Sequence, residues 1–142
     1  MSYVEYPHRE LTSDIIGAAI EVHRALGPGL LESAYEVCLA DELNRRDIDF
    51  KRQLDLPVEF KGRQLDCGYR LDFLVEDLVI VELKCVERIM PIHEAQLLTY
   101  LRLAHKQAGL LINFNVRMLR DGIVRKAMSN PSALSASSAP LR

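Results

Sequence analysis

The sequence predicts a mixed α/β domain in which helices cover a central mixed sheet. Its N-terminal part has helical apolar spacing interrupted by Gly27-Pro28-Gly29. Its middle part alternates with a period of two, and an amphipathic segment beginning at Pro91 separates two apolar, strand-like runs. A chain of 142 residues with 49% hydrophobic content has the size of one domain. We predict that domain over residues 11–128, after an extension at 1–10 and before a Ser-, Ala- and Pro-rich tail at 129–142 that we expect to be disordered.

Two helices are predicted at the start of the chain. Apolar residues between positions 11 and 26 recur mostly at helical intervals, and Thr12 or Ser13 is the candidate N-cap. The Gly-Pro-Gly segment ends this helix, and a second amphipathic helix is expected over about residues 30–46. These two helices should form a helical hairpin.

Three strands in a meander are predicted next. Residues 50–60 alternate strictly, and Lys61-Gly62 turns the chain into a second strand at 65–75. A third strand follows at about 78–86 and is β-branched and apolar. Tyr69 and Phe73 share one face of the second strand, and we interpret both as core residues.

A crossover helix and further strands complete the expected fold. Pro91 suits the first turn of a helix that continues to about residue 106, and a fourth strand follows at 109–114. Because strand, helix and strand occur in order, the fourth strand should lie parallel to the third. Asp121-Gly122 indicates a hairpin turn inside residues 116–128.

Bulk properties limit the function classes. The 18 Lys and Arg residues nearly cancel the 20 Asp and Glu residues, which excludes the pervasive basic field that drives sequence-independent nucleic-acid binding. Any phosphate contact must then be local or metal-mediated. The N-terminus lacks the order of a secretory signal, and no apolar run approaches membrane-spanning length, so we expect no membrane partner. The odd, unpaired cysteines fit a reducing cytoplasm and are expected to be buried and inert: Cys38, Cys67 and Cys85.

The residues that carry chemistry stand on the second and third predicted strands. Glu82 and Lys84 share a face because they are two residues apart. A two-residue loop of Glu76 and Asp77 would turn Asp72 to the face opposite Glu82, whereas a three-residue loop ending at Leu78 sets Asp72 directly across from Glu82. We predict the three-residue loop.

In that register the two carboxylates repel each other, because opposed side chains have β-carbons roughly 4.5–5.5 Å apart. A Mg²⁺ or Mn²⁺ ion would offset the repulsion, and Lys84 could orient an attacking water or stabilise charge on a phosphoryl group. The pattern thus suggests phosphodiester hydrolysis. The alternative is a solvated, purely structural face of an antiparallel hairpin. The apolar run just before Glu82 argues against it, since buried charges usually have partners or bind metals.

Several motifs in order resemble one family. Gly29, Glu32 and Tyr35 fit G-x-x-E-x-x-Y within residues 20–35. The later blocks are Tyr69-Arg70-Leu71-Asp72, Val81-Glu82-Leu83-Lys84, residues 93–101 and residues 109–114. Over about residues 10–126 the chain is similar to the GxxExxY proteins, a branch of the PD-(D/E)xK nuclease superfamily. One departure is that Leu71 stands where the superfamily name implies proline.

The resemblance implies a restriction-endonuclease-like core and a Mg²⁺- or Mn²⁺-dependent nuclease. It implies catalytic roles for five residues, Glu32, Asp72, Glu82, Lys84 and Gln96, with the metal held by the three carboxylates and the backbone carbonyl of Leu83. His23, Tyr35 and Tyr100 are candidates for supporting positions beside them. We expect nucleic acid as the partner, DNA in preference to RNA, and a homodimer would suit cleavage of both strands. The alternative is a non-catalytic nucleic-acid-binding or protein-interaction module that keeps the nuclease fold.

Overall fold

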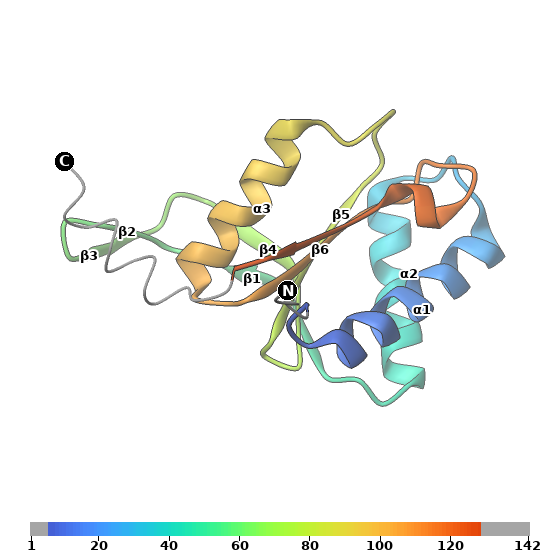
Figure 1. The fold of residues 1–142 in the computed structure, drawn as a ribbon, viewed down its shortest axis with the longest axis horizontal. Helices are drawn as coiled ribbons and strands as arrows, with labels where there is room; N and C mark the ends of the chain where they lie inside the picture. Colours follow the sequence, from blue (N-terminus) through green and yellow to red (C-terminus); the bar gives the residue numbers. More distant parts are fainter. Residues whose placement is uncertain (1–5, 129–142) are drawn as a thin grey trace, which may run out of the picture.

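The computed structural model describes residues 6–128 and arranges them in three layers. Helices α1 (Arg9–Leu26) and α2 (Glu32–Arg45) cover one face of a five-stranded sheet, and helix α3 (Pro91–Ala104) covers the other (Figure 1). The predicted α/β class, N-terminal helical hairpin and crossover helix are all confirmed.

The sheet has the strand order β1-β4-β5-β6-β7. Strands β1 (Phe50–Asp55), β4 (Arg70–Val75) and β5 (Val79–Lys84) form an antiparallel series. Strand β6 (Ala108–Asn113) follows α3 in the chain and pairs with β5 in parallel, and β7 (Ile123–Ala127) runs antiparallel to β6. The sheet is therefore mixed, with β5 at its centre, as the strand-helix-strand order predicted.

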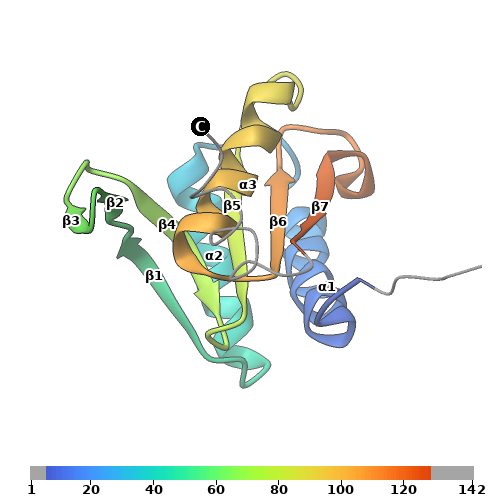
Figure 2. The ribbon, with the colours of Figure 1, turned by 60° about the vertical axis from the view of Figure 1, so that its left-hand side comes forward.

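The predicted strand over residues 50–60 is wrong as a single element, because it breaks at Leu56-Pro57. Proline has no N–H for a ladder bond, whereas the Leu56 N–H just before it still donates to the Tyr69 carbonyl at 2.9 Å. The chain continues as β2 (Val58–Phe60), which pairs with β3 (Arg63–Leu65) across the predicted Lys61-Gly62 turn. This separate hairpin projects beyond the end of β1 and β4 (Figure 2).

The core lies on both faces of the sheet. On the α1 and α2 face, Ile15, Leu39, Phe73, Val81 and Phe114 belong to one buried cluster. On the α3 face, a second cluster contains Leu71, Leu74, Ile80, Leu97 and Leu111. Successive side chains of a strand point to opposite faces, and β5 is apolar on both, which is what a central strand requires. The same alternation directs Glu82, like Ile80, to the α3 face.

Two local predictions are wrong. Neither Thr12 nor Ser13 caps α1, because the helix begins at Arg9 and the Thr12 hydroxyl donates within it to the Arg9 carbonyl at 3.0 Å. Asp121-Gly122 lies in a 3₁₀ turn (η1, Leu119–Gly122) and not in a tight hairpin. A β-carbon on Gly122 would lie 2.3 Å from the Asn113 carbonyl oxygen, so glycine there permits a close backbone approach.

The predictions for the two ends of the chain and for membrane-spanning helices remain. The expected tail at 129–142 lies outside the described residues, as do the first five residues of the expected extension. Within residues 6–128, no helix has both the length and the apolar character needed to cross a membrane.

Candidate active site

Asp72 of β4 and Glu82 of β5 stand opposite each other at the end of their shared ladder. The paired residues are Phe73 with Val81, Leu74 with Ile80 and Val75 with Val79, and the next pair in this register is Asp72 with Glu82. The connecting loop is Glu76-Asp77-Leu78, with φ of 54° and 59° at its first two residues. The predicted three-residue loop and register are confirmed.

The two carboxylates replace backbone groups in holding the strands together at this point. Glu82 Oε2 accepts the main-chain N–H of Asp72 at 2.8 Å, and Asp72 Oδ2 accepts the main-chain N–H of Leu83 at 2.8 Å. A strand residue directs its N–H and C=O to the same side, so the Leu83 carbonyl also faces the β4 side. The reciprocal bonds fix both side chains without consuming all of their oxygen lone pairs.

Three carboxylates and one ammonium group act on one another electrostatically. Burial raises the pKa of Glu82 to about 8, and the Asp72 charge adds to the rise. Burial also raises the pKa of Asp72, against the lowering effects of the Leu83 N–H and of Lys84. Desolvation and then the Asp72 charge raise the pKa of Glu32, which Lys84 lowers. The structure thus brings Glu32, Asp72, Glu82 and Lys84 within electrostatic reach of each other.

Exposure increases outward across this group. Glu82 is only 7% exposed, Asp72 and Lys84 are half-buried, and Glu32 is exposed at the first position of α2. The site therefore has a buried floor and an open side. No described residue forms an ion pair with Lys84, so its ammonium group remains available to a bound anion or water.

Glu36 and Gln53 extend the site and were missed in the sequence. The Gln53 amide donates to Glu36 Oε1 at 2.9 Å and to Asp72 Oδ1 at 3.4 Å. Arg52 donates to the other oxygen of Glu36 at 3.1 and 3.2 Å. The i,i+4 spacing of Glu32 and Glu36 could have indicated Glu36. Gln53 has no such signal, because its role depends on a φ of 52° inside β1.

The end of β5 is held by Asn113, a buried residue at the end of β6. Its side-chain oxygen accepts the Val86 N–H at 3.1 Å, and its side-chain nitrogen donates to the Val86 carbonyl at 2.9 Å. The Lys84 carbonyl in turn accepts the Phe114 N–H at 2.9 Å. These bonds fix the backbone on which Lys84 stands.

Tyr35 organises the loop before Glu32. Its hydroxyl donates to the Gly27 carbonyl and accepts the Leu30 N–H at 3.2 Å, and its ring stacks on Phe114 at 4.5 Å. The His23 ring bonds the Val116 carbonyl through Nε2 at 2.8 Å. Within residues 6–128, neither Tyr35 nor His23 forms a hydrogen bond to the carboxylates, and both hold the loops that flank the site.

Gln96 and Tyr100 lie on α3 and line a groove of about 520 Å³ with Tyr69. Burial raises the pKa of Tyr100, and the charges of Glu82 and Asp72 raise it further, so its hydroxyl is within their electrostatic reach. Within the described residues the Gln96 side chain makes no hydrogen bond to a carboxylate. The interpretation of Tyr69 as core is wrong, since it is 43% exposed and packs against Tyr100 at 5.9 Å.

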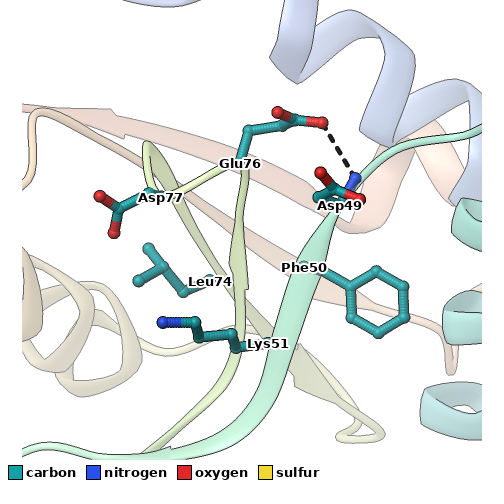
Figure 3. Close-up of a pocket in the computed structure, with 6 residues that line it drawn as sticks. All are labelled: Asp49, Phe50, Lys51, Leu74, Glu76 and Asp77. Carbon is teal, nitrogen blue, oxygen red and sulfur yellow. Dashed lines mark hydrogen bonds between the residues drawn. The ribbon is translucent and has the colours of Figure 1, made fainter.

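Other predicted features take ordinary structural roles. The cysteines are free, but Cys67 is exposed and Cys38 and Cys85 are half-buried, which corrects the expectation that all are buried. A separate hollow of about 300 Å³ lies at the turn between β4 and β5, where the Glu76 carboxylate accepts the Asp49 N–H at 2.9 Å (Figure 3). Its other lining residues, Lys51 and Asp77 among them, do not belong to the carboxylate group.

The donor set fits a hard divalent cation in chemistry. Carboxylate and carbonyl oxygens are the ligands that Mg²⁺ and Mn²⁺ prefer, and a cation would stabilise the ionised forms of the three carboxyl groups, which burial disfavours here. Yet over residues 6–128 no group of three or more His, Cys, Asp or Glu side chains is arranged to hold a metal ion. The ligands at hand are then the Asp72 and Glu82 carboxylates and the Leu83 carbonyl, with Glu32 at the exposed start of α2.

Comparison with known proteins identifies the family. Residues 9–126 match a family model described as the PD-(D/E)XK nuclease superfamily. No curated protein matches the chain. Among solved structures, an alkaline exonuclease (LHK-Exo) from Laribacter hongkongensis is similar, with a TM-score of 0.48 and 16% identity over 96% of this chain and 76% of that one. The matched residues include both helices of the hairpin, the strands with Asp72 and Glu82, and α3, and the fold is restriction-endonuclease-like as predicted. The chain therefore belongs to the PD-(D/E)XK nuclease superfamily.

Proposed function

We propose that this protein is a divalent-metal-dependent nuclease that hydrolyses phosphodiester bonds, in DNA in preference to RNA. The observation that supports it most is the opposition of Asp72 and Glu82, whose carboxylates share a partly buried position beside Lys84. An isolated pair of this kind is destabilising, and a cation between the carboxylates would relieve it. Membership of a nuclease superfamily supports the same reaction class.

Each residue receives a role from its position. Asp72, Glu82 and the Leu83 carbonyl would hold Mg²⁺ or Mn²⁺ at the ladder end, and Glu32 would complete the ligand set from the open side. Such an ion supplies an acidified water and polarises the phosphate. The Lys84 ammonium would orient the attacking water and stabilise charge on the phosphoryl oxygens. Gln96, on the adjacent α3, would contact the nucleic acid and not the ion.

We also propose that the chain belongs to the GxxExxY branch of the superfamily. This proposal is supported by the structural role that each of the three motif residues takes. Gly29 has φ of 106°, Glu32 starts α2 beside the carboxylates, and Tyr35 closes the loop between them. The exposed thiol of Cys67 suits a reducing cytoplasm. One catalytic domain would span residues 11–128. A homodimer of this domain would suit cleavage of two strands.

A second candidate function is a non-catalytic module that binds nucleic acid or protein. It is favoured by the lack, across the described part of the chain, of a group of three side chains arranged for a metal. The near-balance of 18 basic and 20 acidic residues is compatible with either candidate.

A cleavage assay separates the candidates. Purified protein is incubated with end-labelled single-stranded, duplex and branched DNA and RNA, with Mn²⁺, with Mg²⁺ or with chelator. The nuclease proposal expects metal-dependent cleavage by wild type and a loss of about 100-fold or more in Asp72→Asn. Glu59→Gln, an exposed acid on β2, is the matched control and should cleave normally. Absence of cleavage under every condition would favour the binding module.

A further inference from the structure

A groove beside α3 is lined by Gln96 and Tyr100, and the proposed reaction alone does not explain it. Its volume is about 520 Å³, which lies in the range of small-ligand sites. One wall is α3, and the other is made by Tyr69 and by Val58 of the β2 hairpin. It is an open groove between a helix and the base of the projecting hairpin.

Aromatic surface is available in this groove. Tyr69 is 43% exposed and meets Tyr100 with ring centroids 5.9 Å apart at 60°, so the two rings are tilted and leave one Tyr69 face unstacked. The Tyr69 carbonyl accepts the Leu56 N–H at 2.9 Å, which ties the main chain at Tyr69 to the segment that follows β1. An exposed aromatic ring is the usual platform for an unpaired nucleobase.

The polar groups of the groove match a nucleotide. Arg102 lines it, is exposed, and forms no ion pair with any residue between positions 6 and 128. An unpaired guanidinium complements a phosphate. Gln96 and Thr99 add an amide and a hydroxyl that can bond a base edge.

The groove also adjoins the reaction centre. Tyr69 stands three residues before Asp72, and Tyr100 packs in one buried cluster with Leu71, the neighbour of Asp72, and Ile80, two residues before Glu82. The groove therefore lies beside the strand ends that carry the carboxylates.

We propose that the α3 groove is a subsite for one unpaired nucleobase of a single-stranded substrate, stacked on Tyr69, with the adjoining phosphate bound by Arg102. This inference rests on the proposed nuclease function and names its substrate as a strand with an unpaired base near the scissile bond. A fully paired duplex cannot offer a base to this groove unless a nucleotide leaves the stack.

Binding measured without metal tests the subsite apart from catalysis. A fluorescent oligothymidylate of about 12 nucleotides and an abasic oligonucleotide of equal length are titrated in chelator, with fluorescence anisotropy as the readout. We expect Tyr69→Ala to weaken oligothymidylate binding about ten-fold and to leave abasic binding unchanged. Tyr69→Phe keeps the ring and should bind as wild type does. Arg102→Ala should weaken both oligonucleotides.

The outcomes separate this inference from the proposed reaction. Equal affinities of wild type and Tyr69→Ala for oligothymidylate, equal weakening on both oligonucleotides, or no binding by wild type would each overturn the subsite. Tyr69-dependent base binding by a protein that never cleaves would keep the subsite and refute the nuclease. Metal-dependent cleavage together with Tyr69-independent binding would keep the nuclease and refute the subsite. Circular dichroism of Tyr69→Ala checks that the variant is folded.

Discussion

Glu82 Oε2 accepts the main-chain N–H of Asp72 at 2.8 Å, at the point where the β4–β5 ladder gives way to side-chain contacts. The bond locks one carboxylate onto the backbone of the residue that bears the other. Since Asp72 Oδ2 is bound in turn to the Leu83 N–H, neither acid can turn away to relieve the repulsion. The fold therefore holds two carboxyl groups together at a position where burial favours a proton on Glu82, and a bound cation would replace that proton.

Stability should depend on pH through Glu82. Its pKa is raised by burial to about 8 from an ordinary value of 4.5, so the folded state binds the extra proton. The resulting stabilisation is fully present below pH 4.5 and is lost as pH rises through about 8. At about 1.4 kcal/mol per pKa unit, metal-free Glu82→Gln should gain on the order of 3–5 kcal/mol over wild type between these limits. Urea unfolding in chelator measures this, and a difference independent of pH would refute it.

Lys84 should act on the reaction and not on metal binding. Replacing it by alanine removes the positive charge near the carboxylates, and we expect the cleavage rate to fall about 100-fold with Mn²⁺ affinity at least as tight as in wild type. Rates under saturating metal and calorimetric titrations measure the two effects separately. A Lys84→Ala protein that cleaves at the wild-type rate would support the reading of this hairpin as purely structural.

Gln53 should trade stability for function. Its φ of 52° lies in the left-handed region, which costs a non-glycine residue about 1–2 kcal/mol, and its amide reaches Asp72 and Glu36. Gln53→Gly should leave the free energy of unfolding unchanged or raise it by up to about 1 kcal/mol, and it should lower the cleavage rate. Lys61→Gly, at φ of 51° in the β2–β3 turn, is the matched control that relieves similar strain away from the site. Equal activity of both variants would contradict a positioning role for Gln53.

Tyr35→Phe should harm stability more than activity. The change leaves the Gly27 carbonyl and the Leu30 N–H without their hydroxyl partner, and we expect a loss of about 1–3 kcal/mol in the free energy of unfolding. Cleavage at a temperature where the variant is fully folded should stay near the wild-type rate. Normal stability with abolished cleavage would instead place Tyr35 in the chemistry.

The register of Asp72 and Glu82 was predictable because side-chain alternation and loop length are local properties of the sequence. Hydrophobic period and Pro91 likewise sufficed for β5, β6 and α3, whereas the predicted strand at 65–75 is divided between β3 and β4. The break at Pro57 and the 3₁₀ turn at Asp121 were not foreseen, because alternation ran through the first and a hairpin signal marked the second.

The remainder of the site depends on tertiary contacts. Glu36 acts through Gln53, whose backbone conformation no propensity favours, and the exposure of Tyr69 follows from the hairpin that diverges beside it. Contacts and exposures of this kind occur where paired strands diverge. The sequence indicates these points only through residues such as Pro57.

Calorimetric titration of Mn²⁺ into wild type, Asp72→Asn and Glu59→Gln tests the central claim most directly. Asp72→Asn keeps the shape of the side chain and removes the charge that opposes Glu82. We predict binding to wild type and Glu59→Gln with equal affinity, and binding at least ten-fold weaker to Asp72→Asn, or about 1.4 kcal/mol or more. Equal Mn²⁺ affinity in all three proteins, or no binding to wild type, would contradict a metal centre at the Asp72 and Glu82 pair.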